Sequence, residues 1–110
     1  MLNVAILGCG RWGLNHLRTL ANLRSEGLVN SITVIDTSKE AREAAILADH
    51  KTNSMKGVKA DLVIIATPSN LHAIQARELM SKGYHVLVEK PLGCCESEAA
   101  QVLALSLIHI

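Results

Sequence analysis

"VAILGCGRWG", from Val4 to Gly13, decides the fold of this chain. A short apolar run suited to a strand buried on both faces leads directly into a glycine turn of the form G-x-G-x-x-G. Apolar residues then recur at helical spacing, at Leu14, Leu17 and Ala21. The stretch therefore predicts a strand over residues 2–7, a tight turn, and a helix that ends near Gly27.

Further strands follow along the chain. We expect them over residues 31–36, 61–67 and 84–88, with one short edge strand within residues 51–55. Aromatic side chains make up only 2% of the residues, so Leu, Ile, Val and Ala must build the core. Such a core suits helices packed closely on a parallel sheet.

The segments between these strands read as helices. Thr37 and Glu40 form a T-x-x-E capping box, which predicts a helix running to about Ala48. Pro68 ends a strand, and the next helix is expected to be capped by Ser69 or Asn70 and closed by a C-terminal glycine, Gly83. A last helix is expected from about residue 96.

Alternating strands and helices joined by short loops require a parallel sheet with right-handed crossovers. The predicted fold class is therefore α/β, a doubly wound parallel-sheet Rossmann domain with strand order 3-2-1-4-5, incomplete at its C-terminal edge. Ligands bind such sheets at the carboxyl ends of the strands, where the order reverses. Four segments are expected to converge there, because each directly follows a strand: Gly8–Gly13, Asp36, Thr67-Pro68 and Glu89-Lys90.

The glycine turn predicts a dinucleotide site. Gly8 permits the tight turn, Gly10 lets the backbone approach a pyrophosphate, and Gly13 lets the helix pack close to the strand. The N–H groups of Arg11 and Trp12 would then point at the phosphates, at the positive end of the helix dipole. The motif counts here because it lies between a predicted strand and a predicted helix.

Asp36, at the end of the second strand, is expected to accept hydrogen bonds from the adenosine ribose. A carboxylate at this position favours NAD and repels the 2′-phosphate of NADP. No arginine occurs in the next three residues, although Lys39 could soften the preference. NAD is the expected cofactor, with NADP the alternative.

Composition excludes several classes of partner. The formal charge is +1 without a basic cluster, which argues against nucleic acid or anionic lipid as a partner. The most apolar stretch near the end of the chain is too short to span a bilayer. The three cysteines, an odd number with two adjacent, indicate a reduced, cytoplasmic chain, and their spacing forms no metal site.

The residues that follow the fourth and fifth predicted strands carry a family resemblance. The chain resembles the N-terminal half of the Gfo/Idh/MocA oxidoreductases in "VAILGCGRWGLNHLRTL", "VIDTSKE" and "DLVIIATPSNLHAIQARELMSKGYHVLVEKPLG". The most specific elements are T-P-x-x-x-H at 67–72 and E-K-P at 89–91. The "GLNHLRTL" segment is similar to that of the family's nucleotide-sugar dehydrogenases.

The resemblance implies hydride transfer between a nicotinamide and a hydroxyl-bearing carbon of a sugar, cyclitol or nucleotide-linked sugar. It implies that Lys90 is catalytic, as an ammonium beside the developing alkoxide. Glu89 would contact the nicotinamide ribose or orient Lys90. It further implies that four residues of the T-P-x-x-x-H segment contact the cofactor: Thr67, Pro68, Asn70 and His72.

Plainer interpretations stay open for several of these residues. Lys90 could be an exposed lysine at a strand end, and Glu89 half of a surface ion pair. His72 could be a histidine satisfied locally near a helix N-terminus. Trp12 could cover the nicotinamide end or belong to the core. For the whole chain, the alternative is a non-catalytic NAD-binding sensor or scaffold module.

The resemblance also bears on the extent of the chain. Residues 1–104 are expected to be a dinucleotide-binding domain. The final "LSLIHI", 105–110, resembles a translated sequencing-library adaptor and is expected to be non-native. Family members carry a second α/β domain that supplies most substrate contacts. We therefore expect the fragment to be inactive alone, and the parent to be a homo-oligomer through that domain.

Overall fold

The computed structural model describes residues 2–88 of the 110. The elements follow in the order β1 (Leu2–Leu7), α1 (Arg11–Ser25), β2 (Val29–Ile35), α2 (Lys39–Ala44), β3 (His50–Thr52), β4 (Leu62–Ile65), a 3-10 turn (Ser69–Leu71), α3 (His72–Ser81) and β5 (His85–Val88). All strand pairs are parallel, and the sheet order is β3-β2-β1-β4-β5. The predicted fold class and strand order are confirmed.

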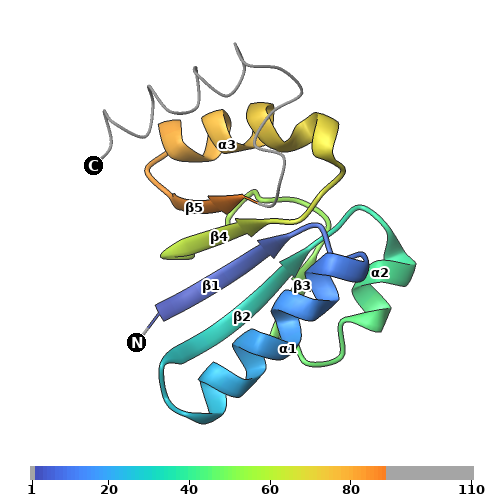
Figure 1. Cartoon of the computed structure of the whole chain (residues 1–110), viewed down its shortest axis with the longest axis vertical. Coiled ribbons are helices and arrows are strands. Elements are labelled where there is room, and N and C mark those ends of the chain that lie inside the picture. The colour runs from blue at the N-terminus through green and yellow to red at the C-terminus, as the bar shows by residue number, and fades with distance from the viewer. Residues whose placement is uncertain (1, 89–110) are drawn as a thin grey trace.

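The sheet separates two layers of helices (Figure 1). α1 packs on one face, and α3 packs on the other, against β4 and β5. Alternate residues of β1 accordingly belong to different clusters: Val4 and Ile6 lie on the α1 face, and Ala5 lies on the α3 face. This burial on both faces explains why the strands read as continuous apolar runs.

The first helix follows its predicted pattern. Leu17 is 1% exposed, and Leu14 and Ala21 pack against the same cluster. The helix ends before Gly27, whose φ of +83° places it in the left-handed region that glycine adopts without strain.

The start of α2 differs from the prediction. Ser38, not Thr37, occupies the N-cap, and its Oγ accepts a hydrogen bond from the N–H of Ala41 at 3.2 Å. Glu40 is then only the second helical residue, one position short of where a capping box requires it. The capping-box prediction was wrong because two adjacent hydroxyl residues compete for one cap.

α2 is also shorter than predicted. It ends at Ala44, and Ala45 leaves the helical conformation with no exposed surface. The chain turns inward there, because burying Ala45 against the α1 face of the sheet outweighs the helix propensity of the following residues. The edge strand β3 then begins at His50, one residue before the predicted range, and ends at Thr52.

The start of α3 is a second correction. The N-cap position is Leu71, without a side-chain cap, rather than Ser69 or Asn70. A 3-10 turn precedes the helix, with the N–H of Leu71 donating to the carbonyl of Pro68 at 3.0 Å. The C-terminal prediction is confirmed, because Gly83 follows the last turn with φ of +93°.

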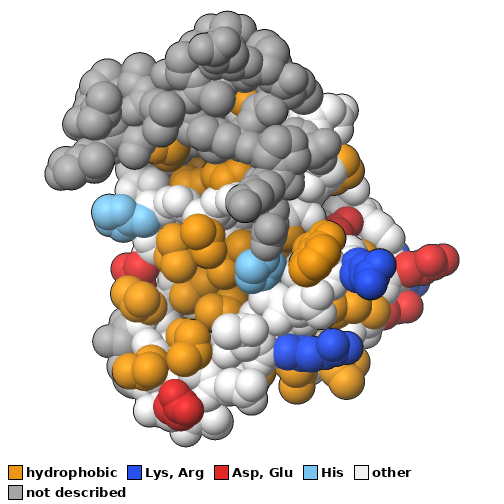
Figure 2. Space-filling model, viewed as in Figure 1, with side chains coloured by type: hydrophobic (Ala, Val, Ile, Leu, Met, Phe, Trp, Pro, Cys, Tyr) orange, Lys and Arg blue, Asp and Glu red, His pale blue; other side chains and the backbone are white. Residues whose placement is uncertain are grey.

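Some predictions fall outside the described residues. These are Glu89, Lys90, the helix expected from about residue 96, and the tail 105–110. Within residues 2–88, no helix is both long and apolar enough to cross a membrane. Hydrophobic side chains are nonetheless visible on the surface, as Figure 2 shows for one face.

Candidate functional site

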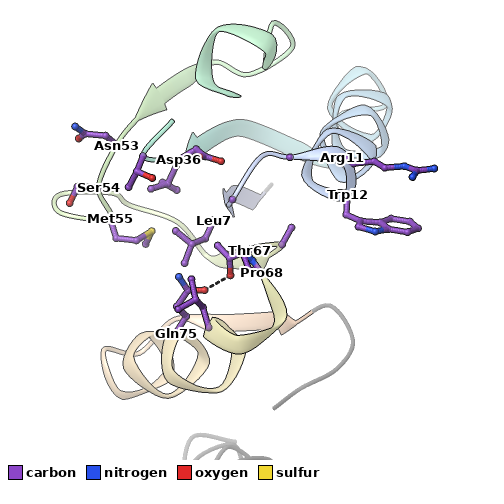
Figure 3. A pocket seen from close by; sticks show the side chains of 16 residues that line it. Leu7, Arg11, Trp12, Asp36, Asn53, Ser54, Met55, Thr67, Pro68 and Gln75 are labelled. Atoms are coloured by element: carbon purple, nitrogen blue, oxygen red, sulfur yellow. Dashed lines mark hydrogen bonds between the residues drawn. The ribbon is translucent and has the colours of Figure 1, made fainter. Parts of the chain in front are cut away.

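A cavity of about 700 Å³ opens at the carboxyl ends of the central strands. Its walls come from the loops after β1, β2, β3 and β4 and from the start of α3 (Figure 3). The lining residues are Leu7, Gly8, Gly10, Arg11, Trp12, Ile35, Asp36, Thr37, Asn53, Ser54, Met55, Ala66, Thr67, Pro68, Leu71 and Gln75. The cavity lies where a doubly wound sheet binds its ligands.

The three glycines of the turn have different surroundings. Gly8 has φ of +91°, and a Cβ there would lie 2.7 Å from Thr67 Cγ2. A Cβ on Gly13 would clash with the carbonyl oxygen of Gly8, so this position must be bare for α1 to pack on β1. A Cβ on Gly10 would meet nothing within 4 Å, so its bareness serves the cavity rather than the packing.

The first turn of α1 is available to an anion. Gly10 is the N-cap and brings no side-chain acceptor to the free N–H groups of that turn. The turn itself is held in place, because the N–H of Gly8 donates to the carbonyl of Ile35 at 2.7 Å. α1 has 15 residues, and its N-terminus lies at the cavity wall without a side-chain cap. Such a helix N-terminus is suited to binding a pyrophosphate.

Asp36 connects the second strand to the glycine turn. Its Oδ2 accepts from the N–H of Cys9 at 2.8 Å, and its Oδ1 accepts from the N–H of Ser38 at 2.9 Å. An ionised carboxylate has about four acceptor positions, so both oxygens can also accept ribose hydroxyls. Arg42 braces the same turn through Nη1, which donates to the carbonyls of Asp36 at 2.8 Å and Thr37 at 3.1 Å.

The opposite wall is the turn after β4. Thr67 and Pro68 line it, and the hydroxyl of Thr67 is hydrogen-bonded to Oε1 of Gln75, as Figure 3 shows. His72 Nε2 donates to the carbonyl oxygen of Thr67 at 2.7 Å. His72 itself is only 2% exposed and does not line the cavity.

The structure brings most of the predicted site residues together. Those lining the cavity are Gly8, Gly10, Arg11, Trp12, Asp36, Thr67 and Pro68. Gly13 supports the turn from behind, and Asn70 and His72 are not among the lining residues. Trp12 is 62% exposed, so it is a residue of the cavity wall rather than of the core. Glu89 and Lys90 lie beyond the described part of the chain.

Sequence reasoning missed the wall formed after β3. Asn53, Ser54 and Met55 line the cavity, and Gln75 faces them from α3. The position directly after a strand was the available signal, but β3 is too short and polar for its end to be located from the sequence. Gln75 carried no signal, because only the packing of α3 on the sheet turns it toward Thr67.

Cys9 lies in the glycine turn but faces the core, with 1% of its surface exposed. Burial raises the pKa of the Cys9 thiol, and the nearby Asp36 carboxylate raises it further, while Lys51 opposes both. The thiol therefore stays protonated, as expected for a residue that fills a small apolar space. Among the described residues, no group of three or more His, Cys, Asp or Glu could hold a metal ion.

Residues 2–106 match the family model described as the oxidoreductase family, NAD-binding Rossmann fold. The chain is 32% identical to 4-carboxy-2-hydroxymuconate-6-semialdehyde dehydrogenase of Sphingobium sp., over 96% of this chain and 35% of that protein. It is 30% identical to inositol 2-dehydrogenase of Leifsonia xyli, over 94% of this chain and 32% of that protein.

Solved structures agree with these relatives. WlbA dehydrogenase from Bordetella pertussis, in complex with NADH and UDP-GlcNAcA, is 27% identical with a TM-score of 0.84, over 97% of this chain and 34% of that one. Myo-inositol 2-dehydrogenase from Lactobacillus plantarum is 25% identical with a TM-score of 0.86, over 98% and 33%. The chain thus spans about a third of the length of these relatives. With the glycine turn, Asp36 and the T-P-x-x-x-H segment in place, the chain belongs to the Gfo/Idh/MocA oxidoreductase family, with an NAD-binding Rossmann fold.

Proposed function

We propose that the chain is the NAD-binding part of a dehydrogenase. The enzyme would act on a hydroxyl-bearing carbon of a sugar, cyclitol or nucleotide-linked sugar. The observation that carries the proposal is the cavity in which the glycine turn and Asp36 are joined by the hydrogen bond from Cys9 to the Asp36 carboxylate. The relatives named as inositol dehydrogenases and the WlbA complex support the substrate class.

The residues present fit NAD. The uncapped N–H groups after Gly10 would hold the pyrophosphate, and Asp36 would accept the hydroxyls of the adenosine ribose. Trp12 and Pro68, which both line the cavity, would border the extended ligand. When bound, the nicotinamide ring supplies the hydride acceptor or donor.

The proposed catalytic residue is Lys90, which the family resemblance places beside the substrate. A lysine ammonium stabilises negative charge that develops on a substrate oxygen, and it can relay the proton that leaves the hydroxyl. Glu89 would orient that ammonium or contact the ribose. Because two thirds of the relatives' length is missing here, we propose that the chain alone turns nothing over.

The preference for NAD is proposed to rest on the charge of Asp36. Its carboxylate would repel the 2′-phosphate of NADP. Arg42, six residues on, donates from Nη1 to two backbone carbonyls of the same turn and so holds the backbone that carries Asp36.

The test compares NAD and NADP binding by the 110-residue chain and its Asp36→Asn variant, using calorimetry. The wild-type chain is expected to bind NAD at least about tenfold more tightly than NADP, and the variant to lose most of that ratio. The ratio of the two affinities serves as an internal control, since structural damage to the turn would weaken the binding of NAD and NADP equally. Equal affinities for the two ligands in the wild-type chain would contradict the assignment of Asp36, and no NAD binding at all would contradict the function.

A further inference from the structure

We infer that His72 is a positioning residue for the cofactor cavity, holding the Thr67 backbone in place without touching the cofactor. The inference rests on the proposed function, because it assigns His72 a role in NAD binding. It replaces direct contact, which the family resemblance implies, with an action through Thr67.

The burial of His72 is the first observation. Among the side chains whose burial the structure describes, it is the one polar or charged side chain that is buried, with 2% exposed. Removing an imidazole from water costs free energy unless its ring nitrogens are hydrogen-bonded. His72 is the first residue of α3 and follows the cavity-lining turn after β4. Its burial therefore requires hydrogen-bond partners at that place.

The bond that His72 makes is the second observation. Thr67 lies beyond the end of β4, so its carbonyl has no place in the sheet ladder. The neighbouring backbone groups are bonded to backbone partners, the N–H of Ala66 to the carbonyl of Leu7 at 2.8 Å and the carbonyl of Pro68 to the N–H of Leu71 at 3.0 Å. The carbonyl of Thr67 instead takes its bond from His72 Nε2, at 2.7 Å. A carbonyl only accepts, so the proton must lie on Nε2.

The third observation links Thr67 to the glycine turn. The backbone nitrogen of Thr67 lies 2.9 Å from where a Cβ on Gly8 would be, so the two segments are in direct contact. Gln75 holds the hydroxyl of the same threonine from the next turn of α3. Thr67 is thereby fixed at its carbonyl and at its side chain, both from α3.

A displacement of Thr67 would therefore be felt at the cofactor. Thr67 and Gly8 both line the cavity, and Gly8 begins the turn that would hold the pyrophosphate. A small displacement of the groups that bind NAD would lower the affinity, because binding depends on groups that are already held in position.

The experiment exploits two amides that resemble different halves of an imidazole. The side-chain N–H₂ of glutamine reaches the place of Nε2, whereas that of asparagine reaches only the place of Nδ1. His72→Gln should keep the bond to Thr67, and His72→Asn should lose it. NAD binding is measured calorimetrically on the 110-residue chain, well below the unfolding temperature of each variant.

We expect His72→Asn to bind NAD about tenfold more weakly than wild type and His72→Gln to stay within about threefold. Ala76→Gly is the matched control, because Ala76 is buried on the same helix but does not line the cavity. It should lower the unfolding temperature and leave NAD affinity unchanged. Affinity lost in parallel with stability, in the control as well, would show a merely structural role.

Wild-type affinity in a folded His72→Asn chain would overturn the inference and leave the proposed function standing. Failure of the wild-type chain to bind NAD would overturn both. Histidine ¹⁵N NMR of the wild-type chain provides a readout that needs no variant. It should show His72 protonated at Nε2 with and without NAD, and a tautomer protonated at Nδ1 alone would exclude the bond to Thr67.

Discussion

Two glycines of the same turn illustrate how one residue type serves two purposes. Gly13 lies against the carbonyl of Gly8, where even a methyl group has no space. Gly10 has open space around it and a φ of −79°, which any residue can adopt. The first protects the packing of α1 on β1, and the second keeps the cavity clear.

Substituting each of these glycines with alanine should therefore separate folding from binding. Gly13→Ala is expected to destabilise the chain by about 1–3 kcal/mol, because the added methyl must push two backbone segments apart. Gly10→Ala is expected to cost less than about 1 kcal/mol and yet to weaken NAD binding about tenfold or more. Thermal unfolding and NAD titration of both variants measure the two effects.

The reverse pattern, with stability lost at Gly10 and affinity alone lost at Gly13, would contradict the roles assigned from the structure. The sequence motif alone predicts these roles, because the spacing of its glycines indicates where the backbone must carry no side chain. His72 is different. Its sequence position suited either a cofactor contact or a local bond, and only its burial and its contact with Thr67 distinguish the two.

At the scale of the element, the cap of α2 shows how local competition is resolved. Thr37 and Ser38 both carry hydroxyls suited to capping, and Ser38 caps. Thr37 instead lines the cavity. The consequence is a helix that starts one residue later than the sequence pattern indicates.

Removing this cap should destabilise the chain modestly. Ser38→Ala is expected to cost about 1 kcal/mol, because the N–H of Ala41 loses its acceptor. Thr37→Ala should cost less, since its side chain does not cap the helix. Chemical denaturation of the two variants measures the difference, and a larger loss for Thr37→Ala would restore the capping box as the true start of α2.

Asp49, in the loop before β3, joins α1 to β2. Its Oδ2 accepts from the N–H of Ile32 at 2.8 Å and from Nη1 of Arg24 at 2.7 Å. Burial by itself raises the pKa of Asp49. The bond from Ile32, the bond and charge of Arg24 and the charge of His50 together outweigh it, and the pKa lies below its ordinary value.

This shift makes stability depend on pH in a defined direction. Because the folded chain holds Asp49 ionised at a lower pH than the unfolded chain does, its contribution is complete above about pH 4. The contribution is lost as the pH falls through the folded pKa. Asp49→Asn should therefore lower the unfolding temperature at about pH 7, and the difference from wild type should shrink on acidification toward about pH 3.

Melting curves of both proteins across that range, at constant ionic strength, test the point. The effect is expected to be small, since the Asp49 side chain is 38% exposed and screened by solvent. A difference that grew with acidity would mean that the neutral acid is the form the fold prefers.

At the scale of the molecule, the parallel order of the strands creates the site. The carboxyl ends of the central strands β1, β2 and β4 lie on the same side of the sheet, because the strands are parallel. The loops that follow these strands surround one cavity. Within the described residues, β5 is an edge strand, and Glu89 and Lys90 directly follow it in sequence. The relatives are about three times as long as this chain.

We therefore expect NAD binding in this chain, and catalytic turnover only in a full-length protein. The 110-residue chain is expected to bind NAD but to produce no NADH from myo-inositol or UDP-linked sugars. Spectroscopic detection of substrate-dependent NADH formation by the purified chain would contradict the proposal that the chain alone is inactive.

In a full-length parent protein, Lys90→Met should abolish turnover and leave NAD affinity within about threefold. The ammonium is removed while the aliphatic stem is retained, so the variant isolates the charge. Turnover assays and NAD titration are run on the same preparation. Surviving turnover would favour the alternative in which this fold serves only as a nucleotide-binding sensor or scaffold.

The sequence by itself determined the alternation of strands and helices, the strand order, the glycine turn and the acid at the end of β2. The alternation, the turn and the acid follow from local patterns of apolar spacing and from the steric demands of bare backbone. The strand order follows from the general rule for doubly wound parallel sheets. Only the tertiary structure decided that Ser38 caps α2, that the loop after β3 completes the cavity, and that His72 points at the Thr67 carbonyl rather than into the cavity. The cap depends on competition between two adjacent hydroxyl residues. The other two features depend on contacts that form only when the helices pack on the sheet.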